Sequence, residues 1–166
     1  MNPTLRNKVA AAIASGASAV AIAVVMLSGR YGLENTIYIP YKDSVGAVTV
    51  CTGHTGPDII WGKRYTQAEC DDLLKKDMAW ATKAVDSSVK VPIPNSMRAA
   101  LYTFTINVGA TGFRKSQVLA KVNAGDRVGA CNALMNWTRA GNNPIALKSR
   151  REVEKEVCRW QLSTKN

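Results

Sequence analysis

The chain has 166 residues, the length of one ordinary globular domain, and 46% of them are hydrophobic against 20% charged. This balance excludes both a disordered chain and a fully membrane-embedded one. With 22 Lys and Arg against 12 Asp and Glu, the net charge is +10, so the surface should attract polyanions such as nucleic acid, anionic lipid or an anionic cell wall. The chain has neither the Cys/His spacing of a zinc finger nor a run of five basic residues, so no nucleic-acid partner is expected.

An uncharged stretch of twenty-one residues, 9–29, follows Arg6 and Lys8. As one helix it would be about 30 Å long, roughly the thickness of bilayer hydrocarbon. Eight of its residues are Ala, three are Ser and two are Gly, so a membrane would hold it less firmly than a Leu-rich span. The basic residues before it direct the amino end to the cytoplasm and the rest of the chain outward.

Three interpretations of this stretch are open: a cleaved signal peptide, a permanent anchor, or a segment that enters the bilayer and later leaves it. The Ala, Gly and Ser content would make exit from the bilayer easy, but composition leaves all three interpretations open. The predicted organisation is a membrane-interacting segment at 1–30 followed by one globular domain at 31–166.

A small β-hairpin is predicted directly after this segment. Strands are expected at 37–41 and 47–50, because β-branched and aromatic residues flank a Gly-containing turn at 43–46. Residues 53–57 read as a loop.

The remainder of the chain has the pattern of helices. Thr66 and Glu69 form a capping box for a long helix, and Asn95 or Ser96 is expected to cap a second helix that runs to about Val108. Two shorter helices are expected at 115–123 and 126–137, and an amphipathic helix at 149–160. The long helix should bury Leu73, Leu74, Met78 and Ala81. The fold class is α+β, mostly helical with one small hairpin sheet.

The four cysteines are Cys51, Cys70, Cys131 and Cys158. Their wide spacing is unlike that of a zinc site, so no metal is expected. An even number of scattered cysteines fits two disulfides in an oxidising compartment, although buried free thiols are the alternative. The nearest-neighbour pairing, 51–70 and 131–158, is predicted among three possible connectivities.

Candidate catalytic residues surround the predicted hairpin: Glu34 before it, Asp43 at its turn, Thr49 on its return strand and His54 beyond. Cleavage of a glycosidic bond requires one carboxylic acid that protonates the leaving oxygen and a second carboxylate that assists water or stabilises positive charge. The pattern suits this chemistry, but two surface carboxylates would look the same in sequence.

The spacing Glu34-x8-Asp43-x5-Thr49-x4-His54 resembles the catalytic pattern of phage-type lysozymes, glycoside hydrolase family 24. Further blocks agree over about residues 31–162 and include Tyr41-Lys-Asp43, Thr49-Val-Cys-Thr-Gly-His-Thr-Gly56, Ala100-Leu-Tyr-Thr-Phe-Thr-Ile-Asn-Val-Gly109, Gly112-Phe-Arg-Lys-Ser116, Trp137-Thr-Arg-Ala-Gly141 and Arg150-Arg-Glu152. The chain departs from the family at Asn35, where Gly is usual after the catalytic Glu, and at Ser116-Gln-Val-Leu119, where Ser-Thr-Leu is usual.

The resemblance implies a lysozyme-like fold and hydrolysis, without a cofactor, of the β-1,4 bond between N-acetylmuramic acid and N-acetylglucosamine in peptidoglycan. Glu34 would be the general acid, Asp43 the base or electrostatic partner, and Thr49 a residue that holds the attacking water. The family usually inverts the anomeric carbon.

The resemblance also assigns non-catalytic residues. His54 would form a structural pair with Asp77. By position, Asn107, Phe113 and Ser116 are candidate sugar contacts, although Asn107 and Phe113 suit packing equally well.

Residues 9–29 resemble the amino-terminal segment of signal-anchor-release endolysins of lambdoid phages. This implies a chain that leaves through the host export machinery, waits inactive on the inner membrane facing the periplasm, and is then released into the periplasm as a monomer. We expect release to let 9–29 pack on the domain as a helix and draw Glu34 into place. The rival functions are a lytic transglycosylase, which would not need Asp43 or Thr49, and a non-enzymatic basic module that binds wall or membrane.

Overall fold

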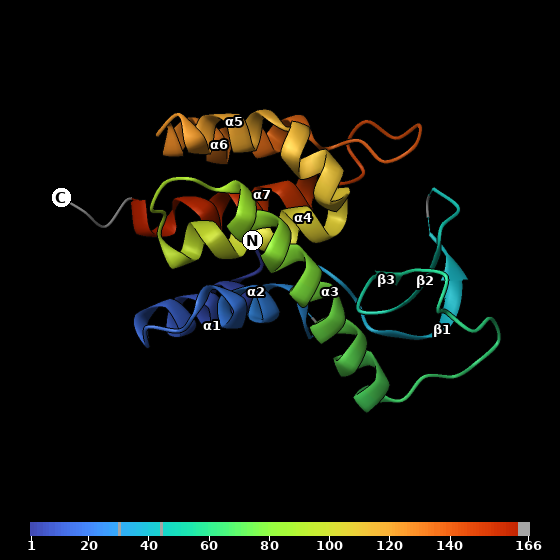
Figure 1. Ribbon diagram of the computed structural model, residues 1–166. Coiled ribbons are helices and arrows are strands. Elements are labelled where there is room, and N and C mark those ends of the chain that lie inside the picture. Colours follow the sequence, from blue (N-terminus) through green and yellow to red (C-terminus); the bar gives the residue numbers. More distant parts are fainter. Residues whose placement is uncertain (30, 44, 163–166) are drawn as a thin grey trace.

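The computed structural model describes residues 1–29, 31–43 and 45–162. A larger lobe contains most of the helices and a smaller lobe contains a three-stranded sheet, with the long helix α3 (Gln67–Ser88) running from one to the other (Figure 1). The predicted class, mostly helical with one small sheet, is confirmed.

The amino-terminal segment forms two helices rather than the single helix expected from its composition. Helix α1 spans Pro3–Ala14 and α2 spans Ala19–Leu27. The break has a local cause, because Gly16 has a φ of 76° and the Ser18 side chain caps α2 by accepting a hydrogen bond from the Ala21 amide. No helix within the described ranges is long and apolar enough to cross a bilayer.

Both helices contribute side chains to the main hydrophobic core of the larger lobe. Helix α2 packs on α4 (Asn95–Lys115), which also packs on α7 (Lys148–Arg159), and Figure 1 shows α1 and α2 lying along one side of this layer. Ile22 and Met26 of α2 are fully buried in the same cluster as Phe104 and Val157. Burial of a side chain of this size stabilises the fold by about 1.5–3 kcal/mol.

The smaller lobe contains an antiparallel sheet in the order β1-β2-β3, with β1 at Ile37–Lys42, β2 at Val48–Cys51 and β3 at His54–Thr55. The hairpin is confirmed, and one residue of its predicted turn, 44, lies outside the described residues. The strand β3 falls where the sequence predicted a loop.

Helix α3 begins at the predicted capping box. The Glu69 amide donates to the Thr66 hydroxyl at 3.2 Å, and the Thr66 amide donates to the Glu69 carboxylate at 2.8 Å. Of the four residues predicted on its buried face, Met78 and Ala81 are buried, whereas Leu73 and Leu74 are half-buried.

The remaining helices follow the predicted order. Helix α4 starts one residue after Pro94 and has no side-chain cap, so the predicted capping by Asn95 or Ser96 is wrong; Ser96 is buried, and its amide donates instead to Gln161. Helix α4 also extends beyond the predicted end and is kinked at Gly109. The other elements are α5 (Gln117–Asn123), α6 (Arg127–Ala133), η1 (Leu134–Asn136) and η2 (Trp160–Leu162).

Two disulfides link neighbouring elements, in the pairing that the sequence predicted. Cys51 at the end of β2 is joined to Cys70 in the first turn of α3, and Cys131 of α6 is joined to Cys158 of α7. The first therefore fixes the sheet to the long helix, and the second fixes two helices of the larger lobe together.

Candidate active site

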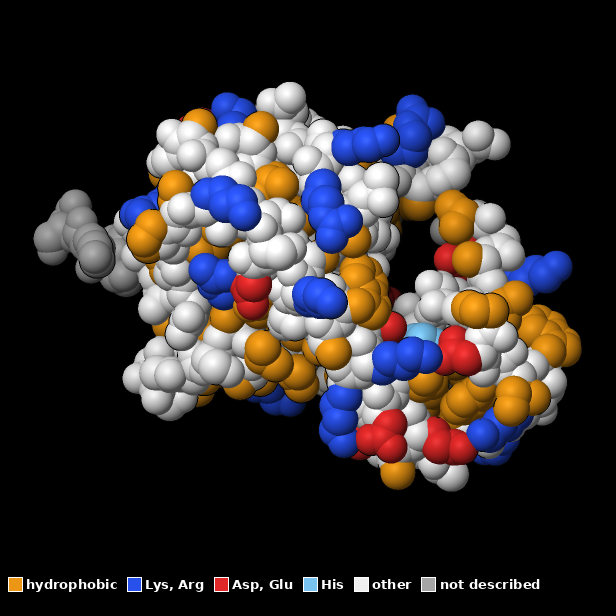
Figure 2. Space-filling view, in the orientation of Figure 1, with side chains coloured by type: hydrophobic (Ala, Val, Ile, Leu, Met, Phe, Trp, Pro, Cys, Tyr) orange, Lys and Arg blue, Asp and Glu red, His pale blue; other side chains and the backbone are white. Residues whose placement is uncertain are grey.

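A cleft of about 650 Å³ lies between the two lobes. Figure 2 shows the surface hollowed where the smaller lobe faces the larger one. The polar and charged residues that line the cleft are Glu34, Asp43, Thr55, Asn107, Arg139, Arg150 and Arg151. Glu34 and Asp43, the two carboxylates expected to do the chemistry, therefore open onto the same space.

The backbone at Glu34 is held by the amino-terminal segment. The Leu33 amide donates to the Met26 carbonyl at 2.8 Å, and the Glu34 amide donates to the Leu27 carbonyl at 3.2 Å. The Glu34 side chain is 24% exposed. On its other side it lies against Gly53, where a Cβ atom would be 2.9 Å from the Glu34 carboxyl carbon. Glu34 is thus fixed between α2 and the sheet lobe.

Asp43 is fixed by the hairpin turn itself. Its Oδ1 accepts hydrogen bonds from the amides of Val45 and Ala47, both at 2.9 Å, which is the usual way in which Asp stabilises a turn. Burial raises the pKa of the Tyr41 phenol, and the negative charges of Glu34 and Asp43 raise it further. The Tyr41 ring therefore lies within the electrostatic field of both carboxylates.

Thr49 does not open onto the cleft as the sequence suggested. Its side chain is 4% exposed, and its hydroxyl donates to the Ala47 carbonyl at 3.2 Å. The residue paired with it on β3, Thr55, is exposed and lines the cleft. Because Thr49 and Thr55 are directly paired across antiparallel strands, their side chains lie on the same face of the sheet.

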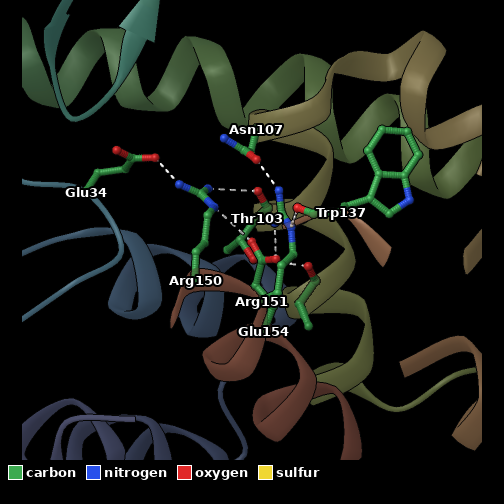
Figure 3. Close-up of polar contacts among 8 residues, drawn as sticks. Glu34, Thr103, Asn107, Trp137, Arg150, Arg151 and Glu154 are labelled. Carbon is green, nitrogen blue, oxygen red and sulfur yellow. Dashed lines mark hydrogen bonds and ion pairs between the residues drawn. The ribbon is translucent and has the colours of Figure 1, made fainter. Parts of the chain in front are cut away.

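Arg150 and Arg151, which line the cleft, form a buried cluster with Glu154 that the sequence analysis did not assign to the site (Figure 3). Arg150 forms an ion pair with Glu34, donates from Nε to Glu154 at 3.1 Å, and donates to the Thr103 carbonyl at 3.1 Å. Arg151 donates to Glu154, to the Asn107 side chain and, from Nε at 2.9 Å, to the Trp137 carbonyl. Arg150 and Glu34 are 116 positions apart in the chain, so their spacing gives no sign that they form an ion pair. The sequence signal that could have pointed to the cluster is the Arg150-Arg151 block, which is part of the resemblance to phage-type lysozymes.

Both arginines keep their positive charge in this buried position. For Arg150, burial opposes the charge, but the carboxylates of Glu154 and Glu34 outweigh burial and raise its pKa. For Arg151, burial has the largest effect and lowers the pKa of the guanidinium, partly offset by Glu154. The cluster therefore contains two cations and, with Glu34 ionised, two anions.

His54 has the position expected of a structural residue. It is 4% exposed, and its Nδ1 is 2.9 Å from the Asp77 carboxylate, while Nε2 is 3.2 Å from Asp58. The hydrogen bond with Asp77 raises the pKa of His54, against the opposing effect of burial. This pair ties β3 to α3 and lies outside the lining of the cleft.

The three predicted sugar contacts separate into two groups. Asn107 lines the cleft, with its side-chain oxygen held by Arg151. Phe113 is fully buried and packs edge-on against Phe104. Ser116 is 4% exposed, and its hydroxyl caps α5 by accepting from the Leu119 amide while donating to the Phe113 carbonyl. Phe113 and Ser116 are therefore buried in this structure, with Phe113 in the packing role that the sequence suited equally well.

Comparison with known proteins agrees with this geometry. The family model "Phage lysozyme" matches residues 32–154. A SAR-endolysin of Enterobacteria phage P21 is 52% identical over 162 residues, which cover 96% of this chain and 98% of that protein.

Two solved structures show the same fold. A mutant of P22 lysozyme has a TM-score of 0.64 at 32% identity, covering 75% of this chain and 88% of that one. The active form of the P1 phage endolysin Lyz has a TM-score of 0.76 at 20% identity, covering 98% and 97%. The chain therefore belongs to the phage lysozyme family and is a glycoside hydrolase of the muramidase type.

Proposed function

We propose that this chain is an endolysin that cleaves the β-1,4 bond between N-acetylmuramic acid and N-acetylglucosamine, with Glu34 as the general acid. The observation that supports this most strongly is that Glu34 and Asp43, placed by different elements, line one cleft between the lobes. A glycan strand fits such an open groove, and the net charge of +10 attracts an anionic wall.

In the reaction, protonated Glu34 gives its proton to the glycosidic oxygen as the bond to the anomeric carbon breaks. Asp43, oriented by two amides, assists the attacking water or stabilises positive charge on the sugar ring. Thr49 is proposed to help hold the attacking water, and in this structure its hydroxyl donates to the Ala47 carbonyl. Asn107 is the remaining proposed sugar contact.

Analysis of the reaction products tests this function. Purified murein digested by the wild-type protein should give muropeptides with free reducing N-acetylmuramic acid ends. Products with anhydro ends would contradict hydrolysis and identify a lytic transglycosylase, which needs a single Glu and no Asp43.

The amino-terminal segment is proposed to keep the enzyme inactive before release. In the membrane, residues 9–29 would form one helix, so α2 could not pack on α4 as it does in this structure. At about 3.4 Å per residue, Glu34 would remain within roughly 17 Å of the bilayer. The partners are then peptidoglycan, the host inner membrane and the host export machinery, and the released form is a periplasmic monomer.

Deletion of residues 1–29 tests the segment's contribution. It removes seven buried core residues: Leu5, Val9, Ala19, Ile22, Ala23, Met26 and Leu27. We expect a domain with little activity and a lower melting temperature than the full chain. Full activity of the truncated protein would favour simple anchoring or cleavage.

A further inference from the structure

Glu154 is a carboxylate on α7 with no exposed side-chain surface. It holds two cations at once, because Oε1 accepts from Arg150 Nε at 3.1 Å and Oε2 accepts from Arg151 Nη1. A buried carboxylate with both oxygens in ion pairs costs much solvation energy. We therefore ask which residues the two arginines that bind Glu154 contact in turn.

Each arginine reaches from Glu154 to a different residue of the cleft (Figure 3). Arg150 extends to the Glu34 carboxylate, and Arg151 extends to the Asn107 side chain. The guanidinium carbon of Arg151 lies over the Phe104 ring, 4.9 Å from its centroid, in a cation–π contact. Glu154 is thus connected to Glu34 through Arg150 and to Asn107 through Arg151.

We propose that Glu154 is a positioning residue for the general acid: by neutralising one of the two arginines, it lets Glu34 take up the proton that the reaction requires. This inference rests on the proposed function of Glu34. Glu154 is not among the residues that line the cleft, and it acts through Arg150 and Arg151.

The charges of the cluster explain this role. With Glu154 ionised, the cluster holds two cations and one fixed anion, so Glu34 faces a single net positive charge. Without the Glu154 carboxylate, Glu34 would face two net positive charges. In a buried cluster, their attraction for the Glu34 carboxylate would oppose the protonation that an acid requires.

Other charged or titratable groups near Glu34 do not replace Glu154. Asp43 and Tyr41 lie on the sheet lobe, and Asp43 is occupied by the hairpin amides. Arg139 lines the cleft and adds further positive charge. Among the described residues, Glu154 is the carboxylate that contacts both arginines.

The dependence of kcat/KM on pH tests the proposal, because the high-pH limb reports the acid that must be protonated. Glu154→Gln should move this limb to lower pH by about one unit or more, the usual effect of one adjacent charge. Arg151→Gln removes a cation and should move the limb to higher pH. The double variant Glu154→Gln/Arg151→Gln restores the balance and should return the limb close to the wild-type position.

The matched control is Glu152→Gln on the same helix, since Glu152 is exposed and lies 4.0 Å from Lys148. It should leave the limb in place. The limb position does not depend on the amount of folded enzyme, and Arg151→Gln supplies a second measurement if Glu154→Gln folds poorly. A limb that stays at the wild-type pH in Arg151→Gln, or in a folded Glu154→Gln, would overturn the proposal. Undiminished activity of Glu34→Gln would overturn the proposed function instead.

Discussion

The backbone amide of Glu34 donates a hydrogen bond to the carbonyl of Leu27, the last residue of α2. The candidate acid is therefore attached directly to the apolar amino-terminal segment. A change in the packing of that segment would therefore move Glu34 directly, because no helix or strand of the described residues lies between α2 and Glu34 in the chain.

Gly32→Ala should break this attachment. A Cβ atom at position 32 would overlap the carbonyl oxygens of Leu27 and Ser28, so the backbone that leads to Glu34 must move. Because a displacement of about 1 Å at a catalytic group can cost roughly 100-fold in rate, we expect a drop of about that size in murein hydrolysis by folded protein.

The comparison for this variant is Ile22→Ala, which removes a fully buried side chain of α2 and leaves the Glu34 backbone contacts intact. It should lower the free energy of unfolding by about 2–5 kcal/mol but retain activity at temperatures where it is folded. Equal activity loss in the two variants, measured on folded protein, would mean that packing alone, and not the Leu27–Glu34 contact, decides the rate.

Gly53→Ala tests the contact on the other side of Glu34. The new Cβ would lie 2.9 Å from the Glu34 carboxyl carbon and would push the acid out of place. Gly46→Ala is the matched control, since Gly46 also has a positive φ but nothing lies within 4 Å of its Cβ position. Both should lose about 1–2 kcal/mol of stability, whereas activity per folded molecule should fall roughly 10- to 100-fold in Gly53→Ala alone. Similar activities of Gly53→Ala and Gly46→Ala would show that the position of Glu34 does not depend on its contact with Gly53.

His54 should make the stability of the fold depend on pH. The Asp77 hydrogen bond raises the His54 pKa above its value in the unfolded chain, so the contribution is fully present below about pH 6 and is lost as pH rises through the folded-state pKa. Urea unfolding should therefore show a lower free energy at about pH 9 than at about pH 6. Asp77→Asn should reduce this difference, and a difference unchanged by that substitution would argue against the pair. His54 is the single histidine of the chain, so its NMR titration gives an independent reading.

Elements with a local chemical signal were predictable from the sequence. The capping box at Thr66 and Glu69 marked the start of α3, and the Gly-containing turn marked the hairpin. The two carboxylates of the cleft were also predictable, because Glu34 and Asp43 lie close together in the chain on either side of one strand.

Features that depend on tertiary contacts were not predictable in this way. The ion pair of Glu34 with Arg150 joins residues 116 positions apart. The burial of Ser116 follows from its capping of α5, and a cap looks the same in sequence as an exposed serine. The break at Gly16 is encoded locally, but an apolar run of twenty-one residues masks it when only length and composition are considered.

The most direct test of the account is the rate at which Glu34→Gln hydrolyses purified murein, compared with the wild type and with the exposed control Glu152→Gln. The amide retains the size of the side chain but has no proton to give to the leaving oxygen. We predict a loss of at least about 100-fold, with the control unchanged. Hydrolysis by Glu34→Gln at the wild-type rate would contradict the central claim that this carboxyl group is the acid.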